Sequence, residues 1–283
     1  MTLQETNTTD LQPIPPPEPT FITNALAFVN QYGFGGIDLD WEYPVCPQVK
    51  LIIVSDAYTG DKDGFSAWVQ ELAEAFHPEG LLVTAAVSAA YDVPSISTYL
   101  DHINVMTYDY HGSWDGQTGH VSPLYAHPDD VDPKFNTDYS IHDWIDKGAD
   151  PQKVILGIPF YGQSFTLADA SNNGLNAQTY GGGEAGTYTR QMGFLAYYEI
   201  CYDVEQGWTV VQDPLGTMGP YAYSGTQWVS YDDIAMVQTK SEYIVSNSLG
   251  GAMIWALDLD DFTNRCGGSE TYPLLKTVNR VYL

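Results

Sequence analysis

The sequence predicts an α/β fold in which a parallel sheet is connected by helical crossovers. Segments with strand character alternate with segments of helical periodicity along most of the chain. Polar or aromatic residues follow each expected strand, as they do where parallel α/β folds build their sites. The chain has 283 residues, of which 44% are hydrophobic, and can therefore bury a large core.

The first segment, residues 1–20, is polar and then rich in proline, which is typical of a linker. Its sequence Asn7-Thr8-Thr9 is a glycosylation sequon, which matters only in a secreted chain. Residues 1–10 contain neither a basic nor an apolar region, so no signal peptide is visible. Cys46 has no visible partner.

The remaining elements follow in order. Apolar residues at helical spacing from Phe21 to Val29 predict a helix that ends at Tyr32-Gly33. Strands are expected at about 34–42, 81–88, 102–110, 153–159 and 251–257, and further helices at about 61–76, 94–100, 139–147, 234–246 and 272–281. The continuous apolar run at 81–88 predicts a strand buried on both faces. No apolar run reaches the length of a transmembrane helix.

The segment from about Ala168 to Asp233 breaks this alternation. It is rich in Gly, Tyr and Thr and lacks a long helical period. We therefore expect a mostly β insertion that packs on the main fold.

The first strand carries an unusual pattern of charge. Asp38, Asp40 and Glu42 occupy alternate positions and so project from one face, opposite the apolar residues Ile37, Leu39 and Trp41. Neighbouring carboxylates repel each other unless they share a proton or bind a cation. Packing residues surround these acids, which argues against a merely solvated strand face and indicates a functional site.

The overall charge limits the possible partners. The chain has 10 Lys+Arg and 36 Asp+Glu residues, which gives a net charge of -26. Such a surface repels phosphate backbones and anionic lipids, so we expect neither nucleic acid nor membrane as a partner. A neutral polymer is not repelled, and the 21 Tyr and 7 Trp residues offer rings that can stack on sugars.

Four stretches, in order along the chain, resemble the glycoside hydrolases of family 18, the chitinases and chitinase-like proteins. Gly36, Asp38, Asp40 and Glu42 match the signature D-G-x-D-x-D-x-E, with Gly35 in place of the first Asp. The other matches are Met106–Trp114, Gly157–Phe165 with Gln163 where the family usually has Arg, and Gly250–Asp258 with its Trp255. The chain is identified as a member of this family.

The resemblance implies a (β/α)8 barrel of the TIM type. The signature strand is the fourth in the family, so the chain is expected to hold about five βα units of an N-terminally incomplete barrel, with an α+β insertion domain between the seventh and eighth strands. The implied division is a linker at 1–20, barrel parts at 21–167 and 234–283, and the insertion domain at 168–233.

The implied reaction is substrate-assisted hydrolysis of chitin with retention. Glu42 would protonate the glycosidic oxygen while the sugar's own acetamido carbonyl attacks the anomeric carbon. Asp40 would orient the acetamido group, Tyr108 would hold its oxygen with Asp109 nearby, and Asp38 would pair with Asp40. Like-charge repulsion in the row would supply the raised pKa of a general acid. Gly35 would deprive Asp38 of one inner partner.

The resemblance also implies residues that bind chitin or chitooligosaccharides, and it requires no metal and no cofactor. The implied substrate-binding residues are Met106, Trp114, Tyr161, Gln163, Met253 and Trp255. The family often joins the positions of Cys201 and Cys266 by a disulfide, which would suit an extracellular protein. His111 is expected to be structural. The oligomeric state is not set by the sequence.

Three hypotheses remain open. The first is an active endo-type chitinase. The second is a non-catalytic chitin-binding or chitinase-like protein that is inactive because the barrel is truncated. The third is a metal-dependent hydrolase in which the acidic row binds a divalent cation. The acids themselves favour the first, the missing strands favour the second, and chelator sensitivity would identify the third.

Overall fold

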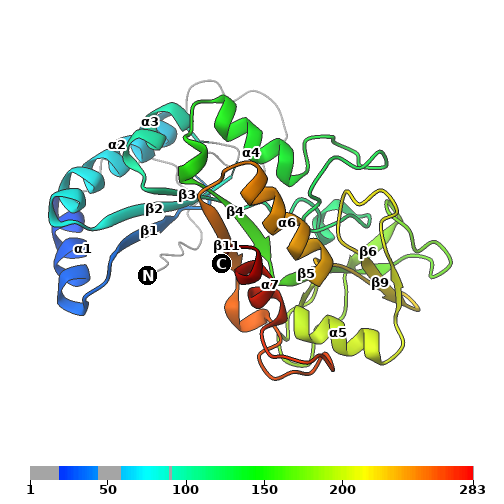
Figure 1. Cartoon of the computed structure of the whole chain (residues 1–283). Coiled ribbons are helices and arrows are strands. Elements are labelled where there is room, and N and C mark those ends of the chain that lie inside the picture. Colours follow the sequence, from blue (N-terminus) through cyan, green and yellow to red (C-terminus); the bar gives the residue numbers. More distant parts are fainter. Residues whose placement is uncertain (1–18, 44–58, 89–90, 283) are drawn as a thin grey trace. The chain divides into compact units, whose positions relative to one another are not determined.

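A computed structural model describes residues 19–43, 59–88 and 91–282 (Figure 1). The expectations for residues 1–18, for the sequon at Asn7 and for Cys46 lie outside the described residues. The chain forms two compact units, Met1–Met106 with Asp143–Ile155, and Thr107–His142 with Leu156–Leu283. Each unit is described by itself.

Helices and strands alternate in the first unit. Its elements are α1 (Pro19–Tyr32), β1 (Gly36–Asp40), α2 (Thr59–Phe76), the 3-10 helix η1 (His77–Glu79), β2 (Leu82–Val87), α3 (Val93–Tyr99), β3 (His102–Val105) and η3 (Pro151–Lys153). Two elements, α4 (Thr137–Asp146) and β4 (Val154–Pro159), begin in one unit and end in the other. The expected helices and strands of this region are confirmed, with strand ends shifted by a few residues.

A parallel sheet is the framework of the first unit. β1 pairs with β2, and β2 pairs with β3, both in parallel. Helix α2 packs on β2 and lies against α1 and α3, which Figure 1 shows in blue and cyan. The register sets Asp38 of β1 opposite Thr84 of β2, so the polar residues of neighbouring strands meet on one face.

The two faces of this sheet differ. Leu39, Val83, Ala85 and Ile103 are all buried and form the apolar face. On the other face Asp38 is exposed and Thr84 is only partly buried. The expectation that residues 81–88 are buried on both faces is therefore wrong, because β2 shares its second face with the acids of β1.

Two strands are also shorter than expected. β1 ends at Asp40 instead of residue 42, and β3 ends at Val105 instead of residue 110. The ladder between β1 and β2 stops at the pair Asp40 and Ala86. Residues 41–43 and 107–110 therefore follow the ends of the strands, a place where residues that build a site are common.

Gly36 allows the close approach of β1 and β2. It lies opposite Leu82, and a Cβ atom on Gly36 would fall 2.1 Å from the carbonyl oxygen of Leu82. Any larger residue would push the strands apart. By contrast, a Cβ atom on Gly35 would meet no atom within 4 Å.

The second unit contains an antiparallel sheet and the last parallel strand. Its elements are η2 (Ser113–Asp115), β5 (Tyr161–Leu167), β6 (Thr179–Gly182), β7 (Phe194–Ala196), α5 (Tyr197–Glu205), β8 (Thr209–Val211), β9 (Tyr221–Ser224), β10 (Gln227–Ser230), α6 (Ile234–Ser246), β11 (Gly251–Trp255), η4 (Leu257–Leu259) and α7 (Pro273–Tyr282). The mostly β character expected after residue 168 is confirmed, with one short helix, α5.

The antiparallel sheet has the order β6-β5-β10-β9-β8, and β7 also pairs with β5. Phe165 and Trp228 are buried in its core with their rings 5.4 Å apart. β11 lies next to β4 in the strand order, and the N–H of Phe160 donates to the carbonyl of Trp255. Helix α6 packs against β11 and α7.

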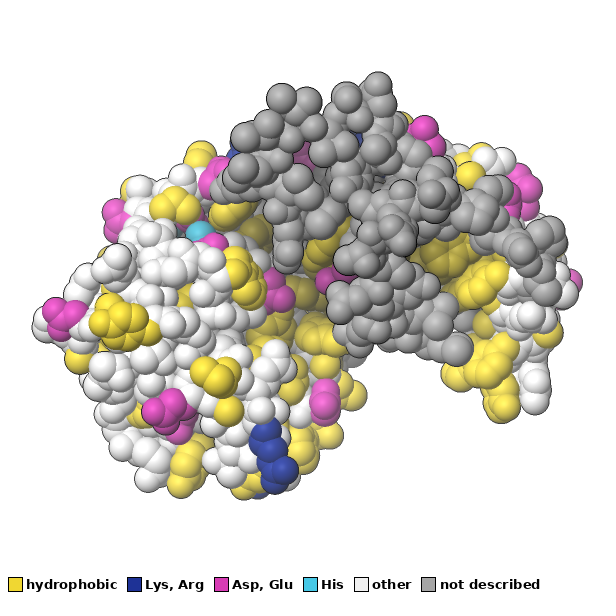
Figure 2. All heavy atoms as spheres, turned by 180° about the vertical axis from the view of Figure 1, so that it is seen from behind, with side chains coloured by type: hydrophobic (Ala, Val, Ile, Leu, Met, Phe, Trp, Pro, Cys, Tyr) yellow, Lys and Arg dark blue, Asp and Glu magenta, His cyan; other side chains and the backbone are white. Residues whose placement is uncertain are grey.

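Charge on the surface follows the composition. Figure 2 shows magenta acidic side chains dispersed over the face in view, with dark-blue basic side chains few in number. In the part of the chain that the structure describes, no helix combines the length and the apolar character needed to cross a bilayer.

Candidate active site

The acidic row lies in the first unit at the end of β1. Asp38 and Asp40 are in the strand, and Glu42 follows two residues beyond its end, where its side chain is exposed. The side chains of Asp40 and Glu42 are hydrogen-bonded to each other. Two carboxyl groups can make such a bond only when one of them carries a proton, so the pair holds a proton between two acids.

The environment of Asp40 favours that proton. Burial raises the pKa of Asp40 above 3.8, the charge of Asp38 raises it further, and the hydrogen bond with Glu42 lowers it. The Oδ1 atom of Asp40 is buried and makes no hydrogen bond to the described residues. A buried, unpaired oxygen is costly, so a substrate group that donates a hydrogen bond there would be stabilised.

Two neutral donors hold Asp38, and sequence reasoning missed both. The hydroxyl of Thr84 donates to Asp38 Oδ1 at 2.5 Å, and the Nδ2 of Asn104 donates to the same atom at 3.0 Å. They come from β2 and β3, so all three strands converge on one carboxylate. The sequence signal was weak: Thr84 is the polar residue of the apolar run 82–87, and Asn104 lies between the apolar residues Ile103 and Val105.

A third residue that the sequence did not indicate holds the segment carrying Glu42. Tyr91 is buried, and its hydroxyl donates to the carbonyl of Trp41 at 3.0 Å. Burial, followed by the nearby groups Tyr43, Asp40 and Glu42, raises the pKa of Tyr91. Its hydroxyl therefore stays protonated and remains a donor at physiological pH.

Five of the expected site residues gather in the second unit. Asp109 Oδ1 accepts hydrogen bonds from the Tyr161 hydroxyl at 2.9 Å and from Gln163 Nε2 at 2.8 Å. The Tyr108 hydroxyl donates to the sulfur of Met253 at 3.6 Å, and its ring meets that of Tyr161 at 6.0 Å. Tyr161 and Gln163, expected as substrate contacts, are buried and act as donors to Asp109.

Asp109 also has unusual surroundings. Burial raises its pKa above 3.8, while hydrogen bonds from Gln163 and Tyr161 lower it. Its backbone φ is 57°, a left-handed conformation that is uncommon outside glycine and more accessible to Asp and Asn than to most residues. This conformation turns the chain sharply between Tyr108 and the loop that follows.

The remaining substrate-binding candidates differ in exposure. Trp114 in η2 is 63% exposed and Trp255 at the end of β11 is 49% exposed, so both offer rings to solvent. Met106 follows β3 in the first unit, where its N–H donates to the carbonyl of Val87.

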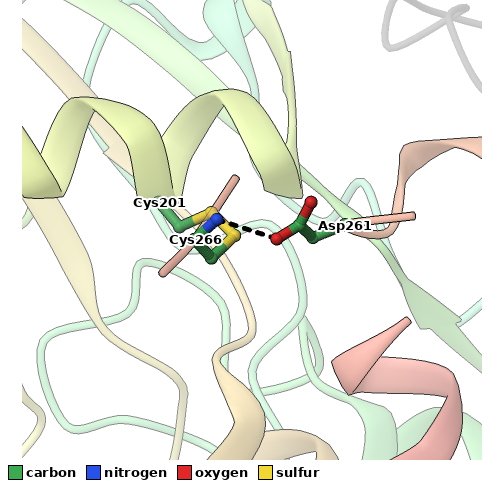
Figure 3. Close-up of side chains that lie close together, drawn as sticks. All are labelled: Cys201, Asp261 and Cys266. Atoms are coloured by element: carbon green, nitrogen blue, oxygen red, sulfur yellow. Dashed lines mark hydrogen bonds between the residues drawn. A yellow bond between two sulfur atoms is a disulfide. The ribbon is translucent and has the colours of Figure 1, made fainter. Parts of the chain in front are cut away.

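The expected disulfide between Cys201 and Cys266 is confirmed (Figure 3). It ties α5 to the segment after β11, with the two Cα atoms 5.2 Å apart. Asp261 lies beside it and accepts the N–H of Cys266 at 2.8 Å. Among the described residues, these three form the group whose ligand atoms gather within 4.8 Å, but both sulfurs are in the disulfide.

Comparison with known proteins identifies the family. The profile of the Glycosyl hydrolases family 18 matches residues 18–260. Over 269 residues the chain is 57% identical to Probable chitinase 10 of Drosophila melanogaster, covering 92% of this chain and 12% of that protein. It is 40% identical to Chitotriosidase-1 of Mus musculus, covering 92% of this chain and 57% of that protein. The chain thus spans only part of the length of these relatives.

Solved structures agree. Catalytic domain 2 of the Ostrinia furnacalis Group II chitinase has a TM-score of 0.88 and 51% identity, over 93% of this chain and 70% of that one. Human YKL-39, described as a pseudo-chitinase with retained chitooligosaccharide binding, has a TM-score of 0.83 and 38% identity, over 92% of this chain and 72% of that one. The fold is therefore of the (β/α)8 TIM-barrel type, and the chain belongs to the Glycosyl hydrolases family 18.

Proposed function

We propose that this chain is a chitinase that hydrolyses the β-1,4 bonds between N-acetylglucosamine units. The observation that carries this proposal is the acidic row, in which Asp40 has a raised pKa and a hydrogen bond to Glu42. Membership of family 18 and the similarity to proteins named chitinases support it. Residues 168–233 would form the insertion domain of the barrel, and residues 21–167 and 234–283 its body.

Each acid has a distinct role in the proposed reaction. Glu42 gives its proton to the glycosidic oxygen, so that the leaving sugar departs as an alcohol. The acetamido oxygen of the substrate attacks the anomeric carbon as the bond to the leaving sugar breaks, and an oxazolinium ion forms with inversion at that carbon. A water molecule then gives a proton to the Glu42 carboxylate and attacks the same carbon from the side that the leaving sugar vacated, so the product has the original configuration. The buried Oδ1 of Asp40 accepts the acetamido N–H and stabilises the positive charge that develops there.

Asp38 completes the row by its charge. The hydrogen bonds from Thr84 and Asn104 fix the carboxyl group of Asp38 beside Asp40, and the charge of Asp38 raises the pKa of Asp40. When Glu42 gives up the proton that the pair shares, Asp40 is left as a carboxylate whose negative charge stabilises the oxazolinium ion. Tyr108 is proposed to donate to the acetamido oxygen, with Asp109 fixing the turn beside it.

The proposed substrate contacts are chemically suited to sugars. Trp114 and Trp255 expose ring faces on which pyranose rings can stack. Met106, Tyr161, Gln163 and Met253 would complete the binding residues. The substrate is chitin or a chitooligosaccharide, and an extracellular location is proposed because the Cys201–Cys266 disulfide forms in oxidising compartments.

A second candidate function is chitooligosaccharide binding without turnover. It is favoured by the 38% identity to YKL-39, a pseudo-chitinase that retains such binding. The intact row of Asp38, Asp40 and Glu42 favours hydrolysis over this alternative.

The test compares the purified 283-residue chain with its Glu42→Gln variant on a soluble chitin oligosaccharide, by product release and by calorimetric binding. Glu79→Gln, at an exposed acid of η1, is the matched control. We expect hydrolysis in the parent and the control and its loss in Glu42→Gln, with binding retained. Binding without turnover in all three would select the second function, and loss of activity with a chelator would select a metal-dependent hydrolase.

A further inference from the structure

His111 lies in the loop that follows Tyr108 and Asp109, and the proposed reaction gives it no role. Its side chain is 5% exposed. Nδ1 lies 2.9 Å from Asp115 Oδ2, and Nε2 lies 3.1 Å from Asp130 Oδ1. Asp115 belongs to η2, four residues after His111, and Asp130 lies further along the chain. The imidazole ring therefore bridges two separate segments.

The contacts at both ring nitrogens define the charge of His111. A carboxylate only accepts hydrogen bonds, and a neutral imidazole has only one N–H to donate. The imidazolium form alone satisfies both contacts. Burial opposes this charge, but hydrogen bonds to Asp115 and Asp130 raise the pKa of His111 to about 9. The nearby His120 is neutral, because burial lowers its pKa to about 3.

Two glycines make room for this arrangement. A Cβ atom on Gly119 would fall 2.3 Å from Cγ of His111, so the ring packs directly on the Gly119 backbone. A Cβ atom on Gly112 would fall 2.3 Å from the ring of Trp114, so that ring lies against the Gly112 backbone. The N–H of Gly112 donates to Asp115 Oδ2, the same oxygen that faces His111.

One carboxylate oxygen thus joins the buried histidine to the backbone under the exposed Trp114. We propose that His111 is a positioning residue that, as an imidazolium between Asp115 and Asp130, fixes the Gly112–Gly116 loop and holds Trp114 ready to stack on a sugar ring. This inference rests on the proposed function only in its last step, because the loop geometry itself can be tested without a ligand.

The ligand-free test measures amide hydrogen exchange of residues 112–116 in the full chain and in His111→Gln, which cannot become charged. His77→Gln is the control, because His77 pairs with Asp101 at 3.0 Å on an exposed surface. We expect exchange in the loop to rise about tenfold in His111→Gln and to stay unchanged in the control. Unchanged exchange in His111→Gln would overturn the proposal, whatever the activity of the chain.

The ligand test is a double-mutant cycle with Trp114→Ala, read by the affinity for a chitin oligosaccharide. Each single variant should bind about tenfold more weakly, and the double variant should bind no more weakly than Trp114→Ala. Additive losses would mean that His111 does not act through Trp114 and would overturn this step. A parent chain that binds no oligosaccharide would instead contradict the proposed function, with the exchange result still deciding the role of His111.

The pH dependence of amide exchange tests whether His111 acts through its positive charge. The folded-state pKa of His111, about 9, is above the ordinary value of 6.5. The stabilisation from the two ion pairs of His111 is therefore fully present below pH 6.5 and is lost as the pH rises through about 9. Loop exchange, corrected for its intrinsic pH dependence, should therefore rise near pH 9 in the parent and show no such step in His111→Gln. Should His111→Gln not fold, Asp115→Asn removes one carboxylate at the loop tip and should give the same loop-specific change.

Discussion

Asp40 and Asp109 show how one physical cause serves two different sites. Burial raises the pKa of both carboxyl groups. Asp40 has a charged acid on one side and shares a proton with another acid on the other, whereas Asp109 accepts two neutral hydrogen bonds. A buried carboxyl group with other acids as neighbours, such as Asp40, is suited to exchange a proton. A buried carboxyl group with neutral hydrogen-bond donors as neighbours, such as Asp109, is suited to hold a fixed position.

The largest expected effect is that of Asp40→Asn. Hydrolysis should fall at least about a hundredfold, because the amide can neither carry the charge nor share the proton. Because folding raises the pKa of Asp40, the ionised carboxylate lowers the free energy of unfolding at pH values above the folded-state pKa. The protein regains this stability as the pH falls through that pKa and Asp40 becomes protonated. The variant should therefore be more stable near pH 7, as measured by thermal unfolding. A variant that is less stable and fully active would contradict both statements.

The next effect concerns the donors to Asp38. Asn104→Leu removes one of the two hydrogen bonds that hold Asp38 Oδ1 in place, so the carboxyl group of Asp38 can turn away from Asp40 and raises its pKa less. We expect the pKa of Asp40 to move down toward its ordinary value and hydrolysis to fall about tenfold. The pH–rate profile checks this prediction. Asn247→Leu, at the end of α6, is the control and should leave the profile unchanged.

A smaller effect is expected at Asp109. Gln163→Leu removes a neutral donor, so the pKa of Asp109 should rise further and the free energy of unfolding near pH 7 should drop by about 1–3 kcal/mol. Gln163→Arg should move the pKa of Asp109 in the opposite direction, because it brings a positive charge. Carbon-detected NMR titration of the carboxyl groups measures both. Identical titrations in the two variants would show that Gln163 does not act on Asp109.

The smallest effect is expected for Gly35→Asp, which restores the first acid of the family signature. Asp38 already accepts hydrogen bonds from Thr84 and Asn104, and the space around Gly35 is open. Hydrolysis should therefore change by less than about twofold. A clear shift of the pH–rate profile would mean that the added acid reaches the row after all.

The sequence predicted elements wherever local periodicity and burial agree. Helix α6 has its expected bounds, and the strands were located because their apolar residues face a core. Strand ends were less predictable, because β1 stops where its ladder with β2 stops, which no local pattern records. Leu82 illustrates the same limit: it is apolar yet 46% exposed.

For the site, the sequence indicated the groups with the most distinctive chemistry. Asp38, Asp40 and Glu42 stand at alternate positions, and this spacing is visible without a structure. Thr84 and Asn104 were missed because a donor from another strand is defined by register, which depends on long-range pairing. The second contact of His111, with Asp130, likewise depends on the path of the chain beyond the loop.

Gly36 bears on how relatives that have lost activity are to be recognised. The position admits no side chain because the carbonyl of Leu82 lies where a Cβ atom would be, whatever chemistry the neighbouring acids perform. A descendant that gave up turnover would still need this glycine in order to fold, whereas its carboxylates would be released from selection. The glycine of the family signature is thus a marker of architecture, and the acids at positions 38, 40 and 42, which we propose as catalytic, would be the marker of catalysis.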